Sequence, residues 1–224
     1  MNPRYWPITY WLMLILFVVF LVQIATLTAG VPFTELLVVN PAAVIHGQQV
    51  WGLFTNMFLH ASIGHILINS WVLFMFGLEL ERIIGGKELL KLFLISGMFA
   101  SVFYVLTSLF ILNSYASALG ASGAIFGILG AMIALRPEKK VIMIFPPIPW
   151  PIPLWLLGIF FVAISILWFG LGGGTGIAEN AHLGGMIAGF LLGRRYKTME
   201  EREHGIIYSF HHPSYNYDWI DEYR

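Results

Sequence analysis

The chain has 224 residues, of which 58% are hydrophobic and only 11% are charged, and its 12 basic side chains balance its 12 acidic ones. This composition excludes an ordinary water-soluble domain and predicts an all-α polytopic membrane protein. No basic block suggests a nucleic-acid partner. The lack of cysteine excludes a disulfide, a thiolate metal site and a cysteine nucleophile.

Six apolar segments define the predicted architecture, since about 20 apolar residues cross a bilayer as a helix. The predicted spans are residues 10–29, 56–80, 89–112, 120–135, 154–171 and 178–193. They form a six-helix bundle over residues 10–195, between a short N-terminal segment (1–9) and a polar tail (196–224). We expect the tail to be solvated, with at most weak order.

Two stretches need a separate interpretation. Residues 10–29 have an alternative as a cleaved signal peptide, which we disfavour because the apolar run is longer than a typical signal-peptide core. Five prolines between residues 146 and 153 predict a stiff extended connection rather than a helix.

The basic residues predict one orientation. If the N-terminus is cytoplasmic and the chain crosses six times, all 12 Lys and Arg residues fall on the cytoplasmic side. Because cytoplasmic loops carry an excess of Lys and Arg, this asymmetry predicts that both termini are cytoplasmic. A cleaved first segment would leave five spans with the same orientation.

A serine between glycines, in Gly120-Ala121-Ser122-Gly123, opens the fourth span. Along each helix, Ser122, His182 and Asn69 lie about 21, 18 and 20 Å from the next cytoplasmic arginine, toward the outer side of the membrane. Because the hydrocarbon core is about 30 Å thick, all three lie between its midplane and its outer surface. The helix that begins at Ser122 is therefore too short to span alone. Non-helical backbone must precede it inside the membrane, which is tolerated only where it is buried in protein or lines a wet cavity.

Glycines spaced four apart mark the fourth and sixth spans. Gly123 and Gly127 form one pair, and Gly185 and Gly189 form the other. Such patterns let two membrane helices approach closely, and this pairing would bring His182 to Ser122. The alternatives are that these glycines pack against other helices, or that the serine and its neighbours serve packing only.

Ser122 and His182 are a candidate nucleophile and base, because a serine hydroxyl needs an adjacent base to attack a carbonyl. No aspartate lies in any span, and Glu179 is expected outside the membrane. We therefore predict a Ser–His dyad without an acidic third member. The Ser122 backbone N–H and the Asn69 side chain are candidate donors to an oxyanion.

Two histidines of the second span adjoin this set. His65 precedes Asn69 by four residues and shares its helix face, whereas His60 lies about 140° away from His65 round a helix. Each of these side chains alone could instead form an interhelical hydrogen bond. A metal site of His60, His65 and His182 is disfavoured, because no carboxylate at that depth joins them. The chain has neither a HExxH motif nor an intramembrane aspartate pair.

Together these residues resemble the rhomboid family over about residues 10–195. Three motifs carry the likeness, in the order and spacing of that family. They are His60, His65 and Asn69 in the second span, Gly120-Ala121-Ser122-Gly123 as the GxSG motif, and Ala181-His182-Leu183-Gly184-Gly185 with Gly189 as the histidine helix.

The resemblance implies an intramembrane serine endopeptidase with Ser122 as nucleophile and His182 as base. It also implies that His65, Asn69 and the Ser122 amide surround the oxyanion. Its substrates would be transmembrane segments of other proteins, and the fifth span would be a lateral gate. No cofactor and no metal are expected.

Three further positions are candidates beside these. Gly120 and His60 adjoin the expected oxyanion site. An aromatic hydroxyl common in the family four residues after the serine is replaced by Phe126, whose ring can still stack on His182.

The sequence thus predicts a multi-pass protein of a prokaryotic cell membrane, with an active site that opens to the outer side and with lipid and transmembrane helices as partners. Two alternatives remain open. One is a non-proteolytic module on the same fold that binds membrane proteins. The other is a small-solute channel lined by His60, His65 and His182.

Overall fold

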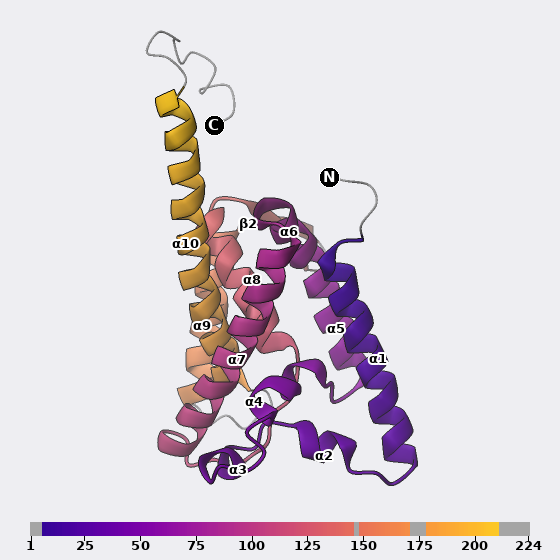
Figure 1. The fold of residues 1–224 in the computed structure, drawn as a ribbon. Coiled ribbons are helices and arrows are strands. Elements are labelled where there is room, and N and C mark those ends of the chain that lie inside the picture. The colour runs from indigo at the N-terminus through magenta and orange to yellow at the C-terminus, as the bar shows by residue number, and fades with distance from the viewer. Residues whose placement is uncertain (1–5, 146–147, 171–177, 211–224) are drawn as a thin grey trace.

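The computed structural model describes residues 6–145, 148–170 and 178–210, and its helices form a bundle (Figure 1). Two of the helical segments are not α-helical, since η1 is a short 3₁₀ helix and η2 is a short π-helix. The helices are α1 (Ile8–Thr28), α2 (Phe33–Leu37), α3 (Pro41–Ile45), α4 (Gly52–Thr55), η1 (Asn56–Phe58), α5 (Ile63–Val72), η2 (Leu73–Gly77), α6 (Leu78–Ile84), α7 (Gly86–Phe110), α8 (Ser122–Leu135), α9 (Leu154–Gly170) and α10 (Glu179–Phe210). Two strands, β1 (Lys140–Phe145) and β2 (Ile148–Pro153), pair antiparallel.

Three helical stretches are long and apolar enough to cross a membrane, namely Ile8–Thr28, Ile63–Ile84 and Gly86–Phe110. Two shorter apolar helices accompany them, Ser122–Leu135 and Leu154–Leu167. Large apolar side chains stay exposed along α1, which suits a helix that faces lipid. The chain is an integral membrane protein, whereas the count of six spans and the side of the termini stay predictions.

The second span begins later than predicted. Its helix starts at Ile63 rather than at residue 56 and continues through α5, η2 and α6 to Ile84. Ser62 explains the start, because its side chain accepts a hydrogen bond from the His65 backbone N–H and caps the helix. His60 therefore lies in the non-helical segment before the span, not on its face.

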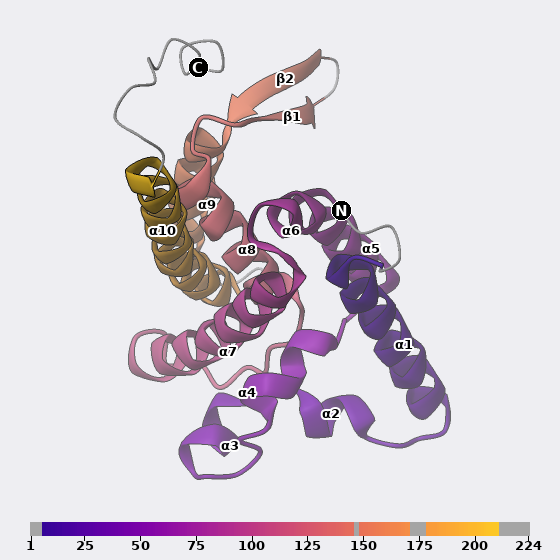
Figure 2. The same ribbon diagram turned by 45° about the horizontal axis from the view of Figure 1, so that its top comes forward.

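Helix α8 begins at Ser122, as predicted, and forms the centre of the bundle. It contacts α5, α7, α9 and α10, and 11 of its 14 residues are buried. Figure 2 shows α1 standing on the far side of α5 and α6 from α8 and α10. A helix enclosed in this way has no need to reach lipid at both ends, which accounts for its shortness.

The close pairing of α8 with α10 is confirmed. A Cβ atom added at Gly185 would overlap the carbonyl oxygen of Gly123, and one added at Gly189 would overlap that of Gly127. The two backbones therefore touch, which only the absence of a side chain permits. This contact fixes the position of α10 along the axis of α8, and hence the position of His182 relative to Ser122.

The proline-rich connection is extended, as predicted for residues 148–153, but its pairing into a hairpin was not predicted. Pro149, Pro151 and Pro153 stand at alternate positions of β2. Successive backbone N–H groups of a strand point to opposite edges, so prolines at every second position remove donors along one edge only. The other edge stays free to pair with β1.

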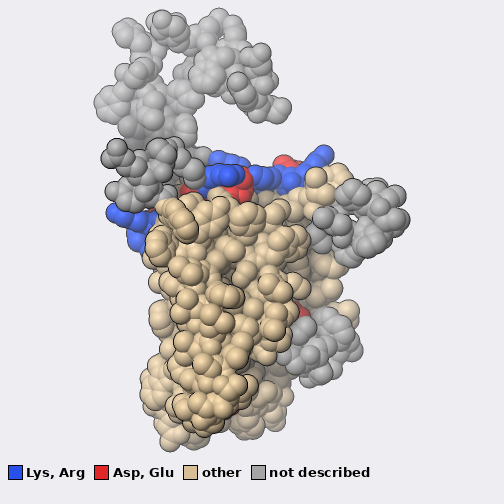
Figure 3. All heavy atoms as spheres, turned by 90° about the vertical axis from the view of Figure 1, so that its right-hand side faces the viewer, with Lys and Arg blue, Asp and Glu red and all other residues tan. Residues whose placement is uncertain are grey.

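Lysines and arginines gather at one end of the molecule (Figure 3). Ion pairs of this end join Arg82 to Glu79 at 3.6 Å and Lys91 to Glu88 at 2.6 Å, and Lys139 also contacts Glu79. Such a charged end is what the positive-inside prediction requires.

Helix α10 extends well beyond the predicted span. The expectation of weak order from residue 196 onward is wrong for residues 196–210, which continue the helix. Strong helix formers (Lys, Met, Glu and Arg) occupy most of residues 197–203 and favour continuation of the helix there. Residues 211–224 of the tail lie outside the described part of the chain.

Candidate active site

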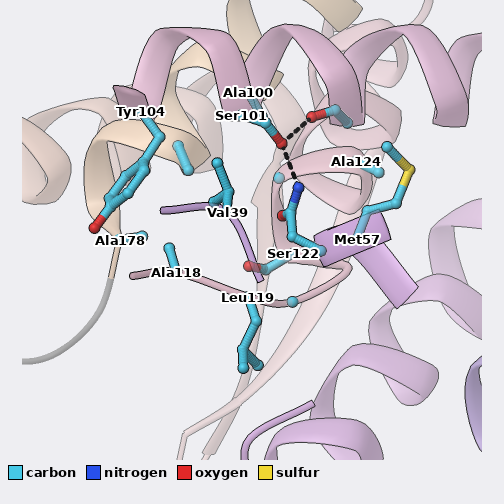
Figure 4. A pocket seen from close by; sticks show the side chains of 15 residues that line it. Val39, Met57, Ala100, Ser101, Tyr104, Ala118, Leu119, Ser122, Ala124 and Ala178 are labelled. Atoms are coloured by element: carbon cyan, nitrogen blue, oxygen red, sulfur yellow. Dashed lines mark hydrogen bonds between the residues drawn. The ribbon is translucent and has the colours of Figure 1, made fainter. Parts of the chain in front are cut away.

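Backbone contacts hold the turn that precedes Ser122 and α8 in one conformation. Gly120 has φ +138°, a conformation that favours glycine, and its N–H donates to the Asn56 carbonyl at 3.0 Å. Ala118 pairs with Val39 in an isolated β-bridge. These contacts hold in place the non-helical backbone that the sequence predicted before the short fourth helix. Ser122 lines a pocket together with Val39, Ala118 and Leu119 (Figure 4).

His182 lies directly against the serine. Its Nε2 is 2.8 Å from the Ser122 Oγ, and its ring stacks on Phe126 with ring centroids 4.4 Å apart and planes at 8°. Phe126 in turn packs edge-on against Phe161 of α9. The imidazole is thus held in one orientation, and the expected stacking by a ring without a hydroxyl is confirmed.

Glu179 was expected outside the membrane and apart from the dyad, but its side chain contacts His182. Its Oε2 is 3.2 Å from the His182 Nδ1, and the same oxygen accepts a hydrogen bond from the Ser165 Oγ of α9 at 3.2 Å. Glu179 is the first residue of α10, so it lies one turn before His182 on the same face. The spacing of three residues was the available signal, and it was missed because Glu179 was expected outside the membrane, away from His182.

Helix α5 brings His65 to the serine turn. A Cβ added at Gly120 would lie 2.8 Å from the His65 Cε1 and 3.0 Å from its Nε2. The Ala61 backbone N–H donates to the His65 Nδ1 at 3.3 Å. Because Nδ1 accepts, the neutral ring carries its proton on Nε2 and presents a donor toward Gly120.

Two other polar residues near His65 are buried, and each has side-chain nitrogens without a hydrogen-bond partner among the described residues. Asn69, one helical turn after His65, is 4% exposed, and its Nδ2 has no hydrogen-bond partner among the described residues. His60 is 2% exposed and has neither ring nitrogen paired within that same set. It packs edge-on against His65 and Phe20 instead. His60 thus packs against His65, the residue whose ring approaches Gly120.

Among the residues whose side chains the structure describes (6–142, 151–167 and 178–198), no three His, Cys, Asp or Glu side chains lie close enough together to hold a metal ion.

Comparison with known proteins places this arrangement in a family. Residues 47–197 match the model of the Rhomboid domain. The chain is 37% identical over 150 residues to RHOMBOID-like protein 1 of Arabidopsis thaliana, a match that covers 67% of this chain and 35% of that protein. It is 31% identical over 168 residues to rhomboid protease GluP of Bacillus subtilis, covering 73% of this chain and 30% of that protein.

A third relative is matched over more of its own length. The chain is 29% identical over 200 residues to Rhomboid-like protease 2 of Toxoplasma gondii, which covers 81% of this chain and 64% of that protein. The chain thus spans about a third of the Arabidopsis and Bacillus proteins. Since the family model matches most of the chain, including Ser122 and His182, this protein belongs to the rhomboid family.

Proposed function

We propose that this protein is an intramembrane serine endopeptidase that cleaves transmembrane segments of membrane proteins with Ser122 as nucleophile and His182 as base. The contact of 2.8 Å between the Ser122 Oγ and the His182 Nε2 carries the proposal. Two of the relatives in the family are named as proteases, which supports the same reaction class.

The proposed chemistry follows from this contact. The Ser122 hydroxyl donates its proton to the His182 Nε2 as the oxygen attacks a peptide carbonyl. His182 then returns the proton to the leaving amine, and water releases the acyl group from Ser122 by the reverse sequence. The ring needs no reorientation between these steps, because Phe126 holds its plane.

Three donors surround the place where negative charge would develop. The Ser122 backbone N–H begins α8, where unpaired N–H groups and the helix dipole favour an anion. His65 presents Nε2–H toward Gly120. Asn69 holds a buried amide donor without a partner among the described residues, as expected of a group that is complementary to a transition state rather than to the resting protein.

The substrate is proposed to be an unwound membrane helix that enters beside α9. Helical carbonyls are already hydrogen-bonded, so a helix must unwind before Ser122 can attack. Apolar side chains such as Ile159 and Phe160 of α9 are exposed, which suits lipid or a substrate helix.

The active site is proposed to open to the outer side of the membrane. The start of α8 lies away from the end at which basic residues gather (Figures 1 and 3), and the positive-inside rule puts that end in the cytoplasm. The relatives come from a plant, a bacterium and Toxoplasma, and two of the plant proteins are named as mitochondrial. They therefore lend no support to a specifically prokaryotic membrane, which we do not propose.

A cleavage assay tests the proposal. The parent protein, reconstituted in liposomes with a model transmembrane substrate, should cut it, and Ser122→Ala and His182→Ala should abolish cutting while remaining folded. Cleavage that persists in Ser122→Ala would refute the assigned nucleophile. Binding without cleavage by the parent would favour the non-proteolytic module, and solute flux that survives Ser122→Ala would favour the channel.

A further inference from the structure

We propose that Glu179 is a positioning residue for His182, so that the machinery is a Ser122–His182–Glu179 triad rather than a dyad. This inference rests on the proposed function. Its basis is the arrangement of three side chains in series, with the Ser122 Oγ 2.8 Å from the His182 Nε2 and the His182 Nδ1 3.2 Å from the Glu179 Oε2.

The carboxylate determines which nitrogen of His182 carries the proton. An ionised carboxylate only accepts hydrogen bonds, so the nitrogen that faces it must be the donor, Nδ1–H. The lone pair of the neutral ring is then left on Nε2, the atom that faces Ser122. Glu179 thus selects the tautomer in which His182 can act as a base toward the serine.

The same carboxylate is suited to the imidazolium that forms when His182 takes the serine proton. The side chains of His182 and Glu179 are only 12% and 14% exposed, so water screens their attraction little. The positive charge appears only after proton transfer. The attraction is therefore stronger in the transition state than in the resting protein, as catalysis requires.

Contacts with neighbouring elements keep Glu179 in place. Ser165 of α9, a residue only 3% exposed, donates to the oxygen that faces His182. Glu179 also lies at the N-terminus of α10, where the helix dipole favours a negative charge. Ser122 and Phe126 of α8 contact His182 from the neighbouring helix.

The competing interpretation is that Glu179 only stabilises the start of α10. Both roles predict a loss on substitution, but they differ in what is lost. A helix-terminal carboxylate contributes to the free energy of unfolding, and its removal lowers the amount of folded protein. A positioning residue contributes to kcat of each folded molecule and leaves KM and stability nearly unchanged.

The experiment measures kcat, KM and thermal unfolding in liposomes for Glu179→Gln, Glu179→Ala, Glu179→Asp and Ser165→Ala. Glu35→Gln, which neutralises an exposed glutamate of α2, is the matched control and should behave as the parent. Glu179→Gln and Glu179→Ala should lower kcat about 10- to 100-fold, a share of what a general base supplies. Their KM should stay within about threefold of the parent value.

The two remaining variants should lower kcat by smaller factors. Glu179→Asp keeps the charge at the same helix position and should restore kcat to within about fivefold of the parent. Ser165→Ala removes one of the contacts of the carboxylate and should lower kcat by only about two- to fivefold.

A spectroscopic signature gives a second readout. In protein with ¹⁵N-labelled histidine, the His182 resonances, assigned by their loss in His182→Ala, should show the Nδ1–H tautomer in the parent. Glu179→Ala should shift this population toward Nε2–H.

A kcat for Glu179→Gln within twofold of the parent would overturn the inference, as would a loss that the melting temperature alone accounts for. Failure of the proposed function has a different signature, since it would appear as cleavage that survives Ser122→Ala or His182→Ala. If those two variants are inactive while Glu179→Gln equals the parent, only the triad is refuted.

Discussion

The two sides of Ser122 differ in how their polar groups are paired. On the side of α9 and α10, the serine oxygen, both nitrogens of His182 and the facing oxygen of Glu179 all have partners. On the side of α5, the Asn69 amide nitrogen and both His60 nitrogens are buried, with no partner among the described residues. An unpaired buried donor costs about 1–3 kcal/mol, so the second side carries a cost that the first does not.

This difference assigns a separate task to each side. Under the proposed function, the paired side would hold a nucleophile and its base ready in the resting protein. The unpaired side would present donors to a negative charge that exists only during reaction, and this role would explain why the cost at Asn69 is tolerated. His60 has no such role in the proposal, because its ring packs against His65.

The largest effect is expected where the paired side depends on backbone contact. Gly185→Val would force a side chain into the Gly123 carbonyl, separate α10 from α8 and remove His182 from Ser122. Overpacking of this kind costs about 1–3 kcal/mol or more. We expect loss of both thermal stability and cleavage, measured on the same reconstituted sample.

The matched control is Gly64→Ala in the exposed first turn of α5, where the nearest atom to an added Cβ is 3.9 Å away. This variant should leave stability and cleavage unchanged. Full activity in Gly185→Val would show that the backbone contact does not hold the two residues together.

The next effect should separate the two sides directly. Asn69→Ala removes a donor that has no partner among the described residues, so it should lower kcat by about 10²–10³ without a loss of thermal stability. Asn40→Ala removes an asparagine that caps α3 by accepting from the Ala43 N–H. This second variant should cost about 0.5–2 kcal/mol of stability and leave kcat unchanged. Reversed behaviour of the two variants would contradict the assignment of tasks.

The smallest effect is expected at His60. His60→Phe replaces two buried nitrogens, unpaired within the described part of the chain, by an apolar ring of similar shape next to Phe20 and His65. Such a replacement is nearly neutral or stabilising, so the melting temperature should hold or rise and kcat should change by no more than about threefold. A loss of kcat as large as that of Asn69→Ala would place His60 in the oxyanion site after all.

The parts of the fold that the sequence predicted are those controlled by strong local signals. Glycines spaced four apart indicated the α8–α10 contact, and the distance from Ser122 to the next arginine indicated a short helix with non-helical backbone before it. The motifs that contain Ser122 and His182 also indicated which residues would meet. Each of these signals reflects a physical requirement of one residue type.

The parts that it missed depend on single side chains near the start of a helix. The start of α5 at Ile63 rests on one capping hydrogen bond, which the Ser62 side chain accepts. The contact of Glu179 with His182 depends on the direction of one side chain in the first turn of α10. Depth counted from charged residues places a side chain along the membrane normal, but it does not say whether a neighbour at the helix end turns toward the site. The hairpin of β1 and β2 was missed because prolines report an extended backbone, not its partner.

The central claim, that His182 activates Ser122, is tested most directly by covalent labelling. The reconstituted parent is treated with a fluorophosphonate, and the adduct is located by mass spectrometry of the intact protein and its peptides. The account predicts one adduct on Ser122, none in Ser122→Ala, and labelling of His182→Ala slower by at least about 100-fold. An adduct on another residue, or equal labelling rates in the parent and His182→Ala, would contradict it.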